Sequence, residues 1–131
     1  MWLRLVLLTV AVNVCVVELA KTGGLSKVKP NDEHYKLAQL SLRQYLKDSC
    51  ADQDYQVIKV TRASEQVVAG TNYVLNFLVS ATDCDLDENS EPSNSECSVV
   101  DKSDSYPCQS KVFSQPWSDY TEVTEVSCDL E

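Results

Sequence analysis

Six cysteines and a single histidine are the side chains of this 131-residue chain that could carry chemistry. A cysteine and a histidine can act together as nucleophile and base, but His34 and Cys50 lie 16 residues apart on a stretch with a helical pattern. At 1.5 Å per residue they are separated by about 24 Å, too far for a base to reach its nucleophile. A zinc site is not indicated, because the chain has neither a C-x-x-C pair nor a second histidine. We therefore expect no enzyme activity, no metal and no cofactor.

The first twenty residues predict export from the cell. Arg4 precedes an apolar run over residues 5–12, which is too short to span a bilayer and is typical of a secretory signal peptide. We interpret residues 1–20 as the signal peptide, with cleavage after Ala20 or nearer to Cys15. Residues 21–131 are long enough for a single domain with one modest core. The protein is expected to be secreted and extracellular.

Export sets the redox state of the cysteines, because disulfides form and persist in oxidising compartments. Loss of Cys15 with the signal leaves five cysteines, so we expect two disulfides and one free thiol. Cys50 is the candidate for that thiol, since the other four lie together in the C-terminal half, at Cys84, Cys97, Cys108 and Cys128. Sequence alone leaves three pairings of these four open. Cys50 is either buried and inert in a monomer or exposed and able to form a covalent dimer.

The formal net charge of −9 excludes two classes of partner. Nucleic acid and anionic membrane surfaces would repel the chain, and no basic patch is visible in the sequence. Most of the excess acid lies between Asp83 and Asp104, in a stretch rich in Ser, Asp, Glu and Asn. This composition predicts a long irregular connection over residues 83–105. We expect no nucleic-acid partner and no membrane partner.

One helix is predicted early in the chain. Asn31 or Asp32 caps its start, and it should end near residues 47–50. Its apolar face is expected to consist of Tyr35, Ala38, Leu42, Tyr45 and Leu46. His34 is expected in the exposed first turn.

Antiparallel strands are predicted after the helix. Apolar and polar side chains alternate with a period of two over residues 55–60 and 73–79, and again over 111–113 and 120–126. Asn76 and Ser80 are expected on a solvated face of the second strand. A helix followed by hairpin-linked strands is an α+β layer pair, in which the helix lies across the sheet.

The first of two hairpin tips carries apolar side chains where polar ones are usual. It is the stretch Gln66, Val67, Val68, Ala69 and Gly70, which joins two strand patterns. Glycine can adopt a positive φ that a turn requires. Exposed valines at a tip imply a partner, so we interpret this tip as a contact surface.

The second tip and the N-terminal arm each have two interpretations. Pro116 stiffens the loop that carries Trp117, so the indole is either a binding anchor or packs back on its own sheet. Gly23 and Gly24 allow the arm over residues 21–27 to bend along a surface, or it is simply a frayed end.

Taken in order, the glycine pair, the helix, the Q-x-V-x-G stretch, the four late cysteines and Pro116-Trp117 resemble the secreted, two-disulfide (type 2) cystatins. The resemblance implies an antiparallel sheet of four to five strands wrapped around one long α-helix. It implies reversible, tight inhibition of papain-like cysteine proteases such as the cathepsins, whose active-site cleft would be occluded by the arm and both tips. It implies disulfides between Cys84 and Cys97 and between Cys108 and Cys128. The implied protease-binding residues are Gly23, Gly24, Gln66, Val67, Val68, Ala69, Gly70, Pro116 and Trp117.

Two departures from the family pattern qualify this interpretation. Lys21 and Thr22 stand where an apolar pair usually precedes the arm glycine. Some secreted cystatins also inhibit legumain through an asparagine after the helix, and residues 48–52 contain none. We therefore predict no strong legumain inhibition through that loop. The alternative function is a secreted binding or signalling module on the same scaffold, without protease inhibition.

Overall fold

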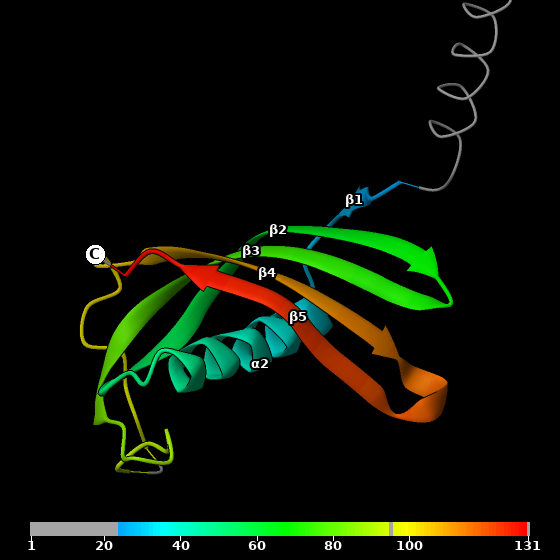
Figure 1. Cartoon of the computed structure of the whole chain (residues 1–131). Helices are drawn as coiled ribbons and strands as arrows, with labels where there is room; N and C mark the ends of the chain where they lie inside the picture. The colour runs from blue at the N-terminus through cyan, green and yellow to red at the C-terminus, as the bar shows by residue number, and fades with distance from the viewer. Residues whose placement is uncertain (1–23, 95, 131) are drawn as a thin grey trace, which may run out of the picture.

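The computed structural model describes residues 24–94 and 96–130, in which one α-helix packs against a five-stranded antiparallel sheet (Figure 1). The elements in chain order are β1 (Ser26–Val28), α2 (Asp32–Asp48), β2 (Gln53–Val68), β3 (Gly70–Asp85), β4 (Tyr106–Gln115), the 3-10 turn η1 (Pro116–Ser118) and β5 (Tyr120–Cys128). The strands follow one another in the sheet in the same order as in the chain. The predicted α+β class, with a sheet wrapped around one long helix, is confirmed.

The helix begins at the predicted cap. The Asn31 side chain accepts a hydrogen bond from the His34 backbone N–H at 3.1 Å, and His34 Nδ1 accepts from the Asn31 backbone N–H at 3.1 Å. The helix buries one stripe against the sheet, consisting of Leu37, Ala38, Leu42 and Leu46. The prediction that Tyr35 belongs to this stripe is wrong. Its ring is exposed and only its hydroxyl turns inward, donating to the Val57 carbonyl at 2.9 Å.

His34 is the main error of the helix prediction. It was expected to be exposed, but it is only 1% exposed. Its Nε2 lies 2.7 Å from a carboxylate oxygen of Glu65 on β2, and its ring meets Tyr73 on β3 edge-on at a centroid distance of 5.8 Å. The first turn of α2 therefore lies over the sheet, and the histidine joins the helix cap to the strand that leads into the first tip.

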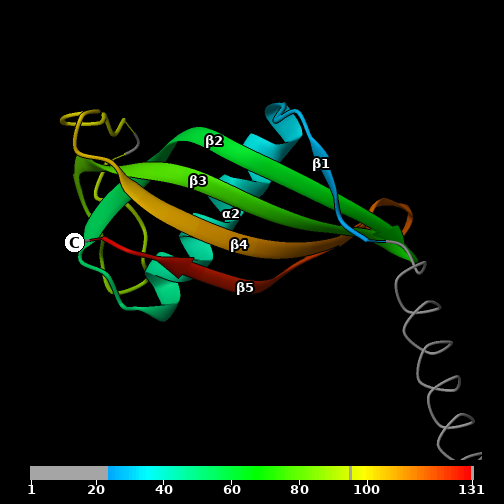
Figure 2. The ribbon, with the colours of Figure 1, turned by 90° about the horizontal axis from the view of Figure 1, so that it is seen from above.

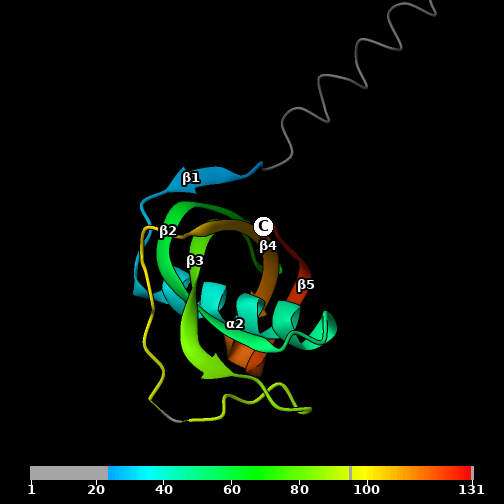
Figure 3. The ribbon, with the colours of Figure 1, turned by 90° about the vertical axis from the view of Figure 1, so that its left-hand side faces the viewer.

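The sheet curves around α2 (Figures 2 and 3). Strands β2 and β3 are 16 residues each, and their register shifts at three places between Gln53 and Arg62. Such irregularities bend a strand and increase its twist, which is how a long hairpin can follow a helix. Leu75, Phe77 and Val79 supply the buried face of β3 as expected.

The predicted solvated face of β3 is partly covered. Ser80 was expected to face solvent, but it is buried and its hydroxyl donates to the Asp104 carbonyl at 3.0 Å. The irregular connection after β3 crosses the sheet at this point, and it is attached by an isolated bridge between Thr82 and Val99. Ser80 is therefore buried by a loop rather than by the core.

Both predicted disulfides are present. Cys84 is bonded to Cys97 and Cys108 to Cys128, so the sequential pairing is confirmed. Cys50 is an unpaired, exposed cysteine just after α2. Across residues 24–94 and 96–130, no helix is long and apolar enough to cross a membrane. The predicted signal peptide and Gly23 lie outside the described residues.

Candidate functional site

The first tip is as short as a hairpin connection can be. Val68 at the end of β2 pairs with Gly70 at the start of β3, so Ala69 alone lies between them. Gly70 has a φ of +122° and is buried. The side chain of Val67 is 80% exposed and that of Val68 is 47% exposed. The turn therefore needs a glycine, and it presents two valines to solvent.

The strand ladder also fixes the position of Gln66. It lies one residue before the valines, opposite Asn72, and is half-buried. The Asn72 side-chain amide donates to its Oε1 at 3.4 Å. Gln66 thus lies at the base of the first tip, with the three residues that follow it forming the exposed part.

The second tip is a single 3-10 turn. Pro116 opens it, and Asp119 closes it with a left-handed φ of 53° and a backbone N–H donated to the Pro116 carbonyl at 3.1 Å. Trp117 is 71% exposed. The indole therefore does not pack back on its own sheet, and its role as a binding anchor stays a prediction.

The two tips lie side by side at one end of the sheet (Figure 1). Thr71, directly after the first tip, pairs with Ser114, two residues before the second. The Gln115 side-chain amide then bridges the tips, donating from Nε2 to the Ala69 carbonyl at 2.8 Å. Residues that are 46 positions apart in sequence are thus in direct contact.

The N-terminal arm points to the same end. Strand β1 is antiparallel to β2, with Ser26 opposite Glu65, so the chain before Ser26 extends toward Gln66 and the first tip. A Cβ at Gly24 would meet no atom within 4 Å. We call the surface formed by Gly24, Gln66–Gly70, Pro116 and Trp117 the loop edge. It contains every predicted protease-binding residue within the described part of the chain.

Three further residues belong to this end of the molecule and were missed. Leu25 and Tyr120 are exposed beside the arm and the second tip, and Gln115 joins the tips. The pKa of Tyr120 is raised, because its hydroxyl donates to the Glu122 carboxylate. Leu25 could have been found as an apolar residue after a glycine pair, whereas nothing in the sequence marks Gln115.

The chemistry of the loop edge is restricted to contact. None of its residues carries a thiol, an imidazole or a carboxylate. It can bury apolar side chains and offer backbone groups for hydrogen bonds, and it cannot act as nucleophile, acid or base. The site is therefore suited to binding a groove.

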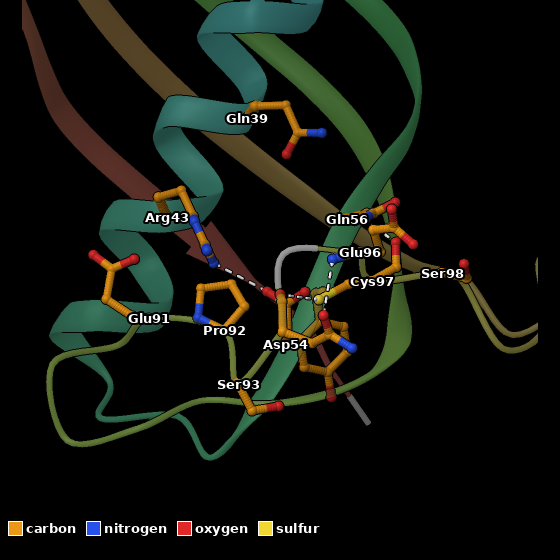
Figure 4. Close-up of a pocket in the computed structure, with 12 residues that line it drawn as sticks. Gln39, Arg43, Asp54, Gln56, Glu91, Pro92, Ser93, Glu96, Cys97 and Ser98 are labelled. Atoms are coloured by element: carbon orange, nitrogen blue, oxygen red, sulfur yellow. Dashed lines mark hydrogen bonds and ion pairs between the residues drawn. The ribbon is translucent and has the colours of Figure 1, made fainter.

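A polar groove of about 820 Å³ lies at the opposite end, between α2, the start of β2 and the loop over residues 91–98 (Figure 4). Three of its polar side chains, Arg43, Asp54 and Gln56, are paired within the protein. Asp54 is buried and accepts from Arg43 at 3.0 Å and from the Thr82 hydroxyl at 2.9 Å. The Gln56 amide donates to the Cys97 carbonyl at 2.9 Å. These bonds attach the helix and the loop to β2, so we interpret the groove as structural.

Comparison with known proteins agrees with the fold. The family model for the cystatin domain matches residues 23–117. The chain is 30% identical over 124 residues to Cystatin-1 of Ornithodoros moubata, covering 95% of this chain and 96% of that protein. It is 31% identical over 113 residues to a cystatin of Naja kaouthia, covering 82% and 80%.

A solved structure gives the same result. The salivary cystatin from the soft tick Ornithodoros moubata superposes with a TM-score of 0.70 at 25% identity, covering 82% of this chain and 97% of that one. The helix, the sheet order and the two disulfides thus occur together with a matching family model. The chain belongs to the cystatin family, whose members are inhibitors of cysteine proteases and not enzymes.

Proposed function

We propose that this protein is a reversible, tight-binding inhibitor of papain-like cysteine proteases of the cathepsin type. The observation that supports this most directly is the convergence of three separate segments at the loop edge. The ladder pair Thr71–Ser114 holds the two tips together, and β1 directs the arm toward them. An N-terminal arm beside two apolar tips has the shape and chemistry to fill a cleft.

Binding would proceed by contact without reaction. Val67, Val68 and Ala69 would cover the catalytic cysteine of the protease, and their backbone would not offer it a scissile bond. Trp117 would pack on the primed side of the cleft, and the arm at Gly23 and Gly24 would follow the non-primed side. Because no covalent bond forms, inhibition would be reversible.

The apolar side chains of the tips can supply a large share of the affinity. Burying Val67, Val68 and Trp117 contributes on the order of 5–9 kcal/mol, at 1.5–3 kcal/mol for each side chain. Association costs roughly 4–15 kcal/mol in lost freedom of motion. Tight binding therefore requires that the tips be ordered before the protease arrives.

Secretion is part of the proposal. Two disulfides are typical of proteins that fold in oxidising compartments, and the sequence of residues 1–20 fits a signal peptide. We propose that residues 21–131 act outside the cell as a single domain, as a monomer unless Cys50 links two copies. The end of the sheet opposite the loop edge, which carries the acidic connection, would then remain in solvent.

Titration of papain and of a purified cathepsin with the secreted protein tests the function. Trp117→Ala should weaken inhibition by about 30- to 150-fold, which corresponds to a binding anchor of roughly 2–3 kcal/mol. Val100→Ala is the matched control, because Val100 is 69% exposed but lies on the distant acidic connection, and it should leave inhibition unchanged. Absence of inhibition by the wild-type protein at micromolar concentration would instead favour a binding or signalling module.

A further inference from the structure

We propose that Gln115 is a positioning residue that couples the two tips of the loop edge and orders them before a protease binds. This inference rests on the proposed inhibitory function and extends it to a residue outside the family's binding motifs. The side chain is half-buried between the tips. Its role is to fix the position of Ala69 relative to the turn that carries Trp117.

Both ends of the Gln115 amide are used. Nε2 donates to the Ala69 carbonyl at 2.8 Å, and Oε1 accepts from the Ser118 hydroxyl at 3.3 Å. The same hydroxyl lies 3.2 Å from the Gln115 backbone carbonyl. The chain Ser118–Gln115–Ala69 therefore runs from the second tip to the first. It continues the contact between the tips beyond the ladder pair of Thr71 and Ser114.

The aliphatic part of Gln115 is fitted to Gly70. A Cβ at position 70 would lie 2.9 Å from Gln115 Cγ, closer than such contacts normally come. The absence of a side chain at Gly70 thus leaves the space in which the glutamine stem lies, while its amide reaches the neighbouring carbonyl. Gly70 and Gln115 act together, since one leaves the space and the other fills it.

The coupling reduces the conformational entropy that the two tips lose when a protease binds. The β3–β4 ladder ends at the pair Thr71–Ser114, so no ladder pair joins Ala69 to the 3-10 turn, which is held to β5 by the pair Gln115–Tyr120. A hydrogen bond across the gap restricts that angle in the free protein, so less freedom remains to be lost on binding. Removing the amide should therefore loosen the second tip and weaken inhibition without unfolding the sheet.

Gln115→Met tests the coupling, because methionine keeps the length of the side chain and removes the donor. Trp117 is the sole tryptophan of the mature residues 21–131, so its time-resolved fluorescence anisotropy reports the motion of the second tip in the free protein. We expect a larger fast depolarisation in the Gln115→Met variant and inhibition of papain weakened by about 3- to 10-fold, as for one exposed hydrogen bond. Gln109→Met, on the same strand six residues earlier and exposed, should change neither readout.

Gln115→Glu provides a rescue that a purely structural role would not produce. The neutral carboxyl can donate to the Ala69 carbonyl and the ionised one cannot, so the coupling should return as the pH falls below about 4.3, the ordinary value for glutamate. Trp117 anisotropy of this variant should approach the wild-type value at low pH. The wild-type protein and the Gln115→Met variant should show no such step.

Three results would overturn the inference. The first is unchanged Trp117 anisotropy in the Gln115→Met variant together with weaker inhibition, which would make Gln115 a direct contact of the protease. The second is a lower melting temperature with unchanged anisotropy, which would make its role structural. The third is a Gln115→Glu variant without a pH step. If the wild-type protein does not inhibit papain, the proposed function fails, while the anisotropy measurements still test the coupling.

Discussion

Replacing Gly70 by alanine is the sharpest test of how the loop edge is built. The residue has a φ of +122°, a conformation that side chains rarely adopt. An added Cβ would lie 2.7 Å from the Ser114 carbonyl oxygen and 2.9 Å from both Gln115 Cγ and Phe113 Cζ. The change therefore adds backbone strain and a clash with the neighbouring strand.

The cost can be bounded from these contacts. Backbone strain of this kind costs about 1–3 kcal/mol, and overpacking adds about 1–3 kcal/mol, so the total is roughly 2–6 kcal/mol. The Gln115 side chain can move aside, but the Ser114 carbonyl belongs to the backbone of a paired strand. The first tip must therefore shift away from the second. Regaining the binding geometry then costs at least about 2 kcal/mol, or roughly 30-fold in affinity.

The assay is the inhibition constant for papain, measured beside the melting temperature of each variant. We expect Gly70→Ala to weaken inhibition at least 30-fold, by the bound just given, while the protein stays folded. Gly24→Ala is the stability control, because its Cβ would meet no atom within 4 Å, and it should leave the melting temperature unchanged. Asn89→Ala, in the distant connection, is the control for inhibition. A folded Gly70→Ala variant that inhibits like the wild type would refute the reasoning.

Four further predictions follow from the fold. His34→Ala should lower the free energy of unfolding by about 2–4 kcal/mol in urea titration, because it opens a cavity and removes the imidazole bonds to the Asn31 backbone N–H and to Glu65; a loss below about 1 kcal/mol would contradict this. Replacing Cys84 and Cys97 by serine should speed hydrogen exchange in the acidic connection and leave inhibition of papain unchanged. The pKa of Tyr73 is raised by burial and then by Glu33 and Glu65, so its contribution to stability should be constant below about pH 10 and be lost above it, and stability in alkali should fall less in Tyr73→Phe. The protein should not inhibit purified legumain, since residues 48–52 hold no asparagine.

Local signals account for what the sequence could predict. Asn31 caps the helix because its side chain reaches a backbone N–H three residues on, a relation between neighbours in the chain. Gly70 marks the hairpin because only a local φ is involved. The number of disulfides and the free thiol at Cys50 could be predicted from the count and positions of the cysteines. The pairing of the four late cysteines came from the family resemblance.

The errors come from contacts between distant segments. β1 was read as an arm without structure, and it becomes a strand because residues 26–28 pair with residues 63–65. His34 looked exposed from its helical position, but it is buried by Glu65 and Tyr73 from two strands. The amide of Gln115 reaches Ala69 only once the three strands β2, β3 and β4 are in register. The hydrophobic periodicity of the sequence predicts none of these contacts.

The position of Cys50 has a consequence for valency. It precedes β2, whose 16 residues run roughly 50 Å of contour, at about 3.3 Å each, before they reach the first tip. Two copies joined through this thiol would contact each other at the end that carries Cys50. Their loop edges would then point away from each other. Such a dimer would bind two proteases at once. Where proteases lie close together on one surface, binding of the second would depend on the distance that the dimer can span more than on the protease concentration in solution.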